Sequence, residues 1–222
     1  MTHRKIIFGS YDTELNGPWT LSGFTLTAAH AREQYTEVPG RDGDLDLSTA
    51  LTDGVPKYGS RTLTVTLERS DGTRLEREAA IDTMVNWLDG WRMDIRLPDD
   101  DLHYMTGRVH VEKNYNDPAH AMVTVTAVCD PWKYNNFDTV LTLTATAETT
   151  EVRLPNAGRR TALPTITITG EGANVLLVYG AYSWALGAGV YQLPDLTVPQ
   201  GGATIAYSGT GTLRINYREA VL

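Results

Sequence analysis

Alternation of apolar and polar residues with a period of two is the feature that most constrains how this chain folds. Residues 61–68, RTLTVTLE, place Leu63, Val65 and Leu67 on one side and threonines on the other. Residues 107–112 and 121–128 repeat the pattern, and residues 91–97 do so with Trp91, Met93, Ile95 and Leu97. This period is typical of antiparallel strands with one buried face. We therefore expect a mainly β protein.

One helix is predicted, over about residues 73–89. Thr73 and Glu76 have the spacing of a capping box, in which each side chain satisfies a free amide of the first turn. Asp89 and Gly90 provide the stop. An apolar face with the helical period is expected to lie on the sheet, and it consists of Leu75, Ala79, Ile81, Met84, Val85 and Leu88.

The chain is predicted to form two domains, residues 1–134 and 138–222. Its 222 residues fit one large or two small β domains, and a Pro- and Asn-containing seam, DPWKYNNFD, covers residues 130–138. The first domain is expected to be a β-sandwich or barrel-like sheet carrying the helix. The second is expected to be a small antiparallel sandwich, with strands in residues 139–146, 151–158, 163–170, 174–180, 190–194 and 211–219.

Charge and cysteine content exclude some functions. The net charge of −8 disfavours binding of nucleic acid by phosphate neutralisation, although DNA could slide past such a surface. The single cysteine, Cys129, rules out an internal disulfide. Because Asp130 follows it, we expect a buried structural thiol and not a nucleophile. We find no apolar stretch with the length of a signal-peptide core or a membrane span.

Three aspartates alternate in VPGRDGDLDLS, residues 38–48, and raise the question of a cation site. An EF-hand loop starting at Asp42 would need Gly at its sixth position and Glu at its twelfth. The chain has Leu47 and Asp53 there. The interpretation we favour is an extended edge on which Asp42, Asp44 and Asp46 face water or a partner. No metal or other cofactor is predicted.

Two other groups of residues leave alternatives open. Asp99 to Asp101 with His103 form an acidic turn that a hydrolase could use. Tyr182 and Trp184 could stack on a glycan, although aromatic residues of a β-sandwich more often fill a core. Nothing in the sequence assembles a catalytic site. The remaining unusual segment, about residues 28–60, is an irregular connection too long to lack a use, and reaching another subunit is one such use.

Seven segments in order resemble the distal tail protein (Dit) family of long, non-contractile-tailed bacteriophages. They are TEVPGRDGDLDLS, YGSRTLTVTLE, the helix ending NWLDGW, YMTGRVHVE, CDPWKY, NAGRRTALPTITITG and GTGTLRINYREAVL. The likeness covers nearly the full length, and it lies in the order and spacing of these segments.

The resemblance implies a non-enzymatic tail-tip hub in the virion, assembled in the host cytoplasm. Its first domain would form a homohexameric ring below the tail tube protein, with a channel for DNA and the tape-measure protein. The arm of each subunit would grip its neighbour, and a galectin-like second domain would carry receptor-binding proteins. The resemblance assigns the arm interface to Pro39, Gly40, Arg41, Asp42, Gly43, Asp44, Asp46 and Arg61, and structural roles to Gly107, Arg108, Pro131 and Trp132. The alternative function is a carbohydrate-binding module for attachment to the host surface, with Tyr182 and Trp184 as its platform.

Overall fold

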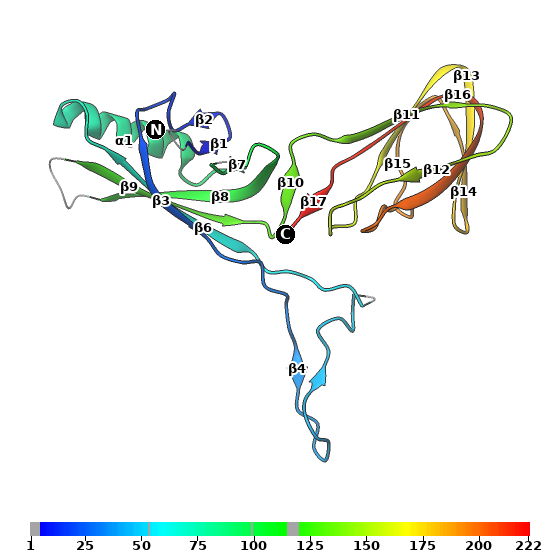
Figure 1. Cartoon of the computed structure of the whole chain (residues 1–222), viewed down its shortest axis with the longest axis horizontal. Helices are drawn as coiled ribbons and strands as arrows, with labels where there is room; N and C mark the ends of the chain where they lie inside the picture. The colour runs from blue at the N-terminus through cyan, green and yellow to red at the C-terminus, as the bar shows by residue number, and fades with distance from the viewer. Residues whose placement is uncertain (1–4, 53, 99, 115–119) are drawn as a thin grey trace. The chain divides into compact units, whose positions relative to one another are not determined.

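The computed structural model describes residues 5–52, 54–98, 100–114 and 120–222 (Figure 1). The chain divides into two compact units, Met1–Lys133 and Tyr134–Leu222. Both are built from antiparallel strands, and among the described residues the helix Arg74–Leu88 (α1) is the only helix. The prediction of a mainly β fold with one helix is confirmed.

The first unit is one antiparallel sheet with the order β2-β1-β7-β8-β9-β6-β3. Helix α1 packs on β8 and β9, and the apolar sides of the strands are buried beneath it. Leu63, Val65 and Leu67 are fully buried, as the alternation predicts. The strands are β1 (Ile7–Phe8), β2 (Tyr11–Asp12), β3 (Thr20–Leu26), β6 (Arg61–Arg69), β7 (Arg92–Arg96), β8 (His103–Asn114) and β9 (Ala121–Cys129).

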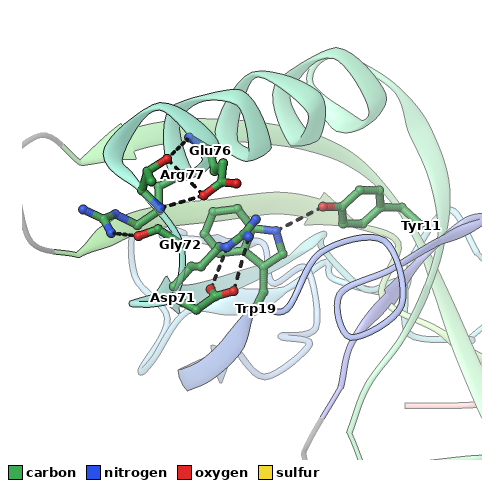
Figure 2. A network of polar contacts seen from close by, with 8 residues as sticks. Tyr11, Trp19, Asp71, Gly72, Glu76 and Arg77 are labelled. Carbon is green, nitrogen blue, oxygen red and sulfur yellow. Dashed lines mark hydrogen bonds and ion pairs between the residues drawn. The ribbon is translucent and has the colours of Figure 1, made fainter.

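Helix α1 begins at the predicted capping box. The Thr73 hydroxyl accepts a hydrogen bond from the Glu76 amide at 3.3 Å, and the Glu76 carboxylate accepts one from the Thr73 amide at 2.7 Å. Figure 2 shows this corner, where Arg77 also donates to the Gly72 carbonyl and the Trp19 indole donates to the Tyr11 hydroxyl. These bonds tie the start of the helix to the loop that leaves β6.

Three residues expected in the core are exposed instead, namely Leu75, Ala79 and Trp91. Leu75 is 80% exposed, because it lies in the first turn of α1, and the buried stripe begins only at Ile81 and continues through Met84 and Leu88. Trp91 is 64% exposed, because it precedes β7 in the turn after the helix and not in the strand itself. The alternation holds from Met93 onward, where Ile95 is fully buried.

The second unit is a sandwich made by two long bent strands, β13 (Thr165–Tyr179) and β16 (Ala203–Tyr217). The first half of β13 pairs with β15 and the end of β16, and its second half pairs with β14 and the start of β16. Both halves bury side chains in one core, which includes Ile168 and Leu177. The other strands are β11 (Thr139–Ala145), β12 (Thr150–Leu154), β14 (Tyr182–Gly187) and β15 (Gly189–Gln192); β10 (Lys133–Asn135) pairs with β17 (Ala220–Val221).

Glycines make the bend of this ribbon. Gly209 and Gly211 have φ of +120° and +119°, and a Cβ on Gly209 would lie 2.1 Å from the Asn174 carbonyl oxygen. Opposite them, the register shifts between Thr169 and Asn174 by three residues. Because three is odd, the buried side of β13 changes from even to odd positions. The sequence therefore predicts two separate strands, 163–170 and 174–180, where the structure has one.

Candidate assembly arm

The segment between β3 and β6, residues 27–60, is called the arm. It continues these two paired strands past the end of the sheet as a ribbon (Figure 1). Backbone hydrogen bonds join its legs from Arg32 to Lys57 and from Gly59 to His30. Near the tip, β4 (Tyr35–Thr36) pairs with β5 (Leu45–Asp46).

No described residue from Thr20 to Ser60 is buried. Several apolar side chains of the arm are in contact with water, among them Tyr35 at 56%, Leu51 at 98% and Val55 at 52% exposed. Burial of apolar area is the main source of folding free energy. The arm therefore holds its shape through backbone pairing and a few polar and ring contacts, without a core of its own, and it leaves most of its side chains exposed.

The tip is a tight turn built by Pro39 and Gly40. The Arg41 amide donates to the Val38 carbonyl at 3.2 Å, and Gly40 has φ of +82°. Proline second and a positive-φ glycine third are the residues that a type II turn requires. Gly43 follows with φ of +73°, in a second bend. These two glycines therefore shape the loop that carries Arg41 and Asp42.

The three aspartates of this loop do not form the edge that their alternation predicts. Only Asp46 lies in a strand, whereas Asp42 sits in the bend beside Gly43. The Asp46 carboxylate accepts a hydrogen bond from the Ser48 amide at 2.9 Å, and hydrogen bonds from Ser48 lower its pKa. Among the described residues, no three His, Cys, Asp or Glu side chains converge on a possible metal position. Asp53, the twelfth EF-hand position, lies outside the described residues.

Arg61 joins the arm to the sheet. It is the first residue of β6, and its Nε donates to the Thr27 carbonyl at 2.9 Å. Its side chain lies next to Cys129, its partner in the register between β6 and β9. The residue is only 9% exposed, and burial lowers the pKa of the guanidinium. Its Nη1 is buried with no hydrogen-bond partner among the described residues.

Gly107 and Trp132 complete the base of the arm. A Cβ on Gly107 would lie 2.6 Å from Cys129 Sγ and 3.0 Å from the Val128 carbonyl oxygen, so only glycine fits opposite Cys129. Trp132, which follows Pro131, packs edge-to-face on Tyr58 of the arm, with ring centroids 5.5 Å apart. Arg108 is exposed and donates to the Gly90 carbonyl. Sequence reasoning missed Tyr58 and Thr27, because a partner far along the chain leaves no local pattern.

The other candidate residues hold structural contacts. The His103 ring meets the Asp100 carboxylate at 2.8 Å, and Lys133 meets its second oxygen at 3.2 Å. Burial acts against ionisation of Asp100, but these hydrogen bonds prevail and lower its pKa. Asp99 lies outside the described residues. Cys129 is buried, as expected, and burial, with the Asp130 charge, raises the pKa of its thiol to about 11.

Tyr182 and Trp184 lie together on β14. Their rings stack at 5.9 Å with planes 11° apart, and Tyr182 is 49% exposed while Trp184 packs against the core of the second unit. Each ring covers one face of the other. A sugar ring could therefore stack only on a face of Tyr182 or Trp184 that the other aromatic ring does not cover.

The combination of a helix-covered sheet, an exposed ribbon and a bent-strand sandwich is similar to a fold already seen in solved structures. One of them is the SPP1 Dit (gp 19.1) protein, described as a paradigm of the hub adsorption apparatus in phages that infect Gram-positive hosts. The TM-score is 0.68 at 16% sequence identity, and the match covers 98% of this chain and 99% of that chain. Neither a scan of family models nor a search of curated proteins finds a match.

Proposed function

We propose that this protein is a structural, non-enzymatic component of the tail-tip hub of a long, non-contractile-tailed phage. The observation that carries the proposal is the full-length likeness of fold to SPP1 Dit, a hub adsorption protein. The arm supports it, since a ribbon of this length in which no described residue is buried is suited to contacts outside its own subunit. In this proposal the protein acts in the virion, after assembly in the host cytoplasm.

The assembly we propose is a homohexameric ring. A ring needs a heterologous contact, in which one surface of a subunit meets a different surface of the next. The arm, with Arg41, Asp42, Asp44 and Asp46 at its tip and Arg61 at its base, would supply one of these surfaces. The net charge of −8 would let DNA pass the channel without being held.

The proposed partners are the tail tube and tape-measure proteins on one side and receptor-binding proteins on the other. Among the described residues no helix has the length and apolar character of a membrane span.

Mass measurement of the full-length protein tests the ring. Native mass spectrometry or light scattering at micromolar concentration is expected to give six subunits. Arg41→Glu is expected to weaken the assembly with little change in unfolding midpoint, because the exposed Arg41 side chain takes no part in a core. Arg74→Glu, the same charge change on the exposed first turn of α1, is the control. A wild-type protein that stays monomeric would contradict the ring.

A carbohydrate-binding module is the second candidate. The half-exposed Tyr182 ring, stacked on Trp184, is the observation that favours it, because aromatic faces pack on sugar rings. A glycan array with the wild type and Tyr182→Ala tests it. Tyr182→Ala keeps the more buried Trp184 in place, so that lost binding would report the exposed ring and not a damaged core.

A further inference from the structure

Among the strands that the structure describes, none pairs with the outer edge of β3. β3 pairs with β6 on one side only, and it ends the order of the sheet. The register assigns the direction of its backbone groups. The Thr27 amide donates to the Thr62 carbonyl, and the Thr62 amide donates to the Thr27 hydroxyl. In the register of β3 with β6, Thr25 and Gly23 therefore also direct their backbone groups toward β6, and the N–H and C=O groups of Phe24 and Leu26 point outward.

This edge lacks the features by which proteins usually protect such strands. Edge strands are normally short, charged, interrupted by proline or covered. From Gly23 to Ala29 the chain has neither charge nor proline, and no side chain there is buried. A bulge at Ser22 disturbs only the start of the strand. The other end of the sheet differs, because the Asp12 amide of β2 is bonded to the Asn16 side chain and the Asn16 amide to the Asp12 carbonyl.

The leg of the arm that follows β3 also has an outer side, beyond an interruption of the ladder between Thr27 and His30. Arg32 and Gln34 direct their backbone groups to the returning leg, so those of Ala31, Glu33 and Tyr35 point away from it. An extended leg with unpaired groups on its outer side is itself a strand ready to pair. Each copy of the chain therefore has two different unpaired edges, the outer leg of the arm and the edge of β3. Contact between the arm of one copy and β3 of the next would be heterologous, as a ring requires.

We propose that the arm of a second copy adds as a strand to the free edge of β3. Backbone hydrogen bonds to Phe24 and Leu26 supply the attachment, as in other cases of strand addition. The absence of charge from Gly23 to Ala29 means that the acidic arm meets no repulsion there. This inference rests on the proposed ring and names the surface that receives the arm.

A matched pair of variants at Phe24 tests the contact. Phe24→Pro removes the outward N–H but leaves every bond to β6, and Gly23 before it tolerates the proline ring. Phe24→Ala removes the same side chain and keeps the N–H. Light scattering of full-length protein is expected to show a ring for Phe24→Ala and a loss of assembly on the order of ten-fold or more for Phe24→Pro. Assembly of both variants to the same extent would overturn the inference and leave the ring standing.

Hydrogen exchange gives a second readout on the wild-type protein. The Phe24 and Leu26 amides are expected to exchange on the order of ten-fold more slowly in the ring than in diluted monomer, and those of Ala31, Glu33 and Tyr35 to slow with them. The Thr25 amide, bonded to β6 in both states, is the internal control. Equal exchange of Phe24 and Leu26 in ring and monomer would overturn the inference. A wild type without any oligomer would overturn both it and the proposed ring, and a two-fold dimer would place β3 against β3.

Discussion

The arm and the β13–β16 pair are both long antiparallel ribbons, but they bury their side chains differently. The β13–β16 ribbon bends at glycines, so its two halves share one core that contains Ile168, Val175 and Leu213. The arm continues β3 and β6 without such a bend, and none of its described residues is buried. A ribbon is stable either by folding over itself or by contact with another molecule. The comparison indicates that the arm belongs to the second kind.

Substitution at the bend of the folded ribbon is expected to have the largest effect. Gly209→Ala would place a Cβ 2.1 Å from the Asn174 carbonyl oxygen at a φ of +120°. We expect the second unit to lose roughly 3 kcal/mol or more of unfolding free energy, measured by denaturant-dependent hydrogen exchange of the β13 amides. Gly180→Ala is the control, because its φ is +57° and no atom lies within 4 Å of its Cβ position. Equal losses in the two variants would contradict the assigned strain.

Removal of the contact at the base of the arm is expected to have a smaller effect. Tyr58→Ala deletes the edge-to-face contact with Trp132 and should lower the unfolding free energy of the first unit by about 1 kcal/mol. Hydrogen exchange should rise at the Gly59 and Arg32 amides, which donate to the His30 and Lys57 carbonyls across the base. Tyr35→Ala, near the exposed tip, is the matched control. Unchanged hydrogen exchange at the base in Tyr58→Ala would show that the contact between Tyr58 and Trp132 does not hold the arm.

Acid is expected to destabilise the sheet of the first unit in part through Asp12. Burial opposes ionisation of Asp12, but hydrogen bonds from Lys5 and from the amides of Glu14 and Leu15 lower its pKa below the ordinary 3.8. A lowered pKa means that the stabilisation is complete above 3.8 and is lost as the pH falls through the lower, folded-state value. The free energy of unfolding should therefore fall less steeply between pH 6 and pH 3 for Asp12→Asn than for the wild type. The same dependence of unfolding free energy on pH in both proteins would show that Asp12 does not contribute to the acid sensitivity.

The same glycine substitution in the arm is expected to have the smallest effect. Gly40→Ala strains a turn with φ of +82°, but no atom lies within 4 Å of its Cβ position and no core depends on it. The midpoint of global unfolding should therefore stay within about 0.5 kcal/mol of the wild type, while assembly weakens. A loss as large as that of Gly209→Ala would mean that the arm contributes to the core after all.

Local patterns in the sequence predicted local structure well. Thr73 and Glu76 form the expected capping box, and Leu63 to Leu67 alternate as expected. The patterns failed where distant residues decide the outcome. Gly170 to Gly172 resemble a turn between two strands but form the bend of one, because the pairing with β16 runs on across them. Leu75 fits the helical period, yet no element of the sheet lies under the first turn.

In the arm, too, the sequence predicted some features and not others. The length and irregularity of residues 28–60 predicted an arm, and the structure adds a tight turn at Pro39 and Gly40 near its tip. The alternation of the aspartates was misleading, because Gly43 bends the chain between Asp42 and Asp44. Thr27, Tyr58 and the open edge at Phe24 could not be predicted from a pattern, since each depends on what a distant strand does or does not cover.

Replacement of Ala31–Tyr58 by Asn-Gly tests most directly whether the arm exists for a second copy. His30 and Gly59 are already bonded across the ribbon, so a two-residue hairpin turn can close it there. The account predicts that the shortened chain unfolds within about 1 kcal/mol of the intact protein, because it loses little beyond the Tyr58–Trp132 contact, yet is a monomer by native mass spectrometry where the intact chain forms the ring. A shortened chain that assembles to the same number of subunits as the intact protein would contradict it.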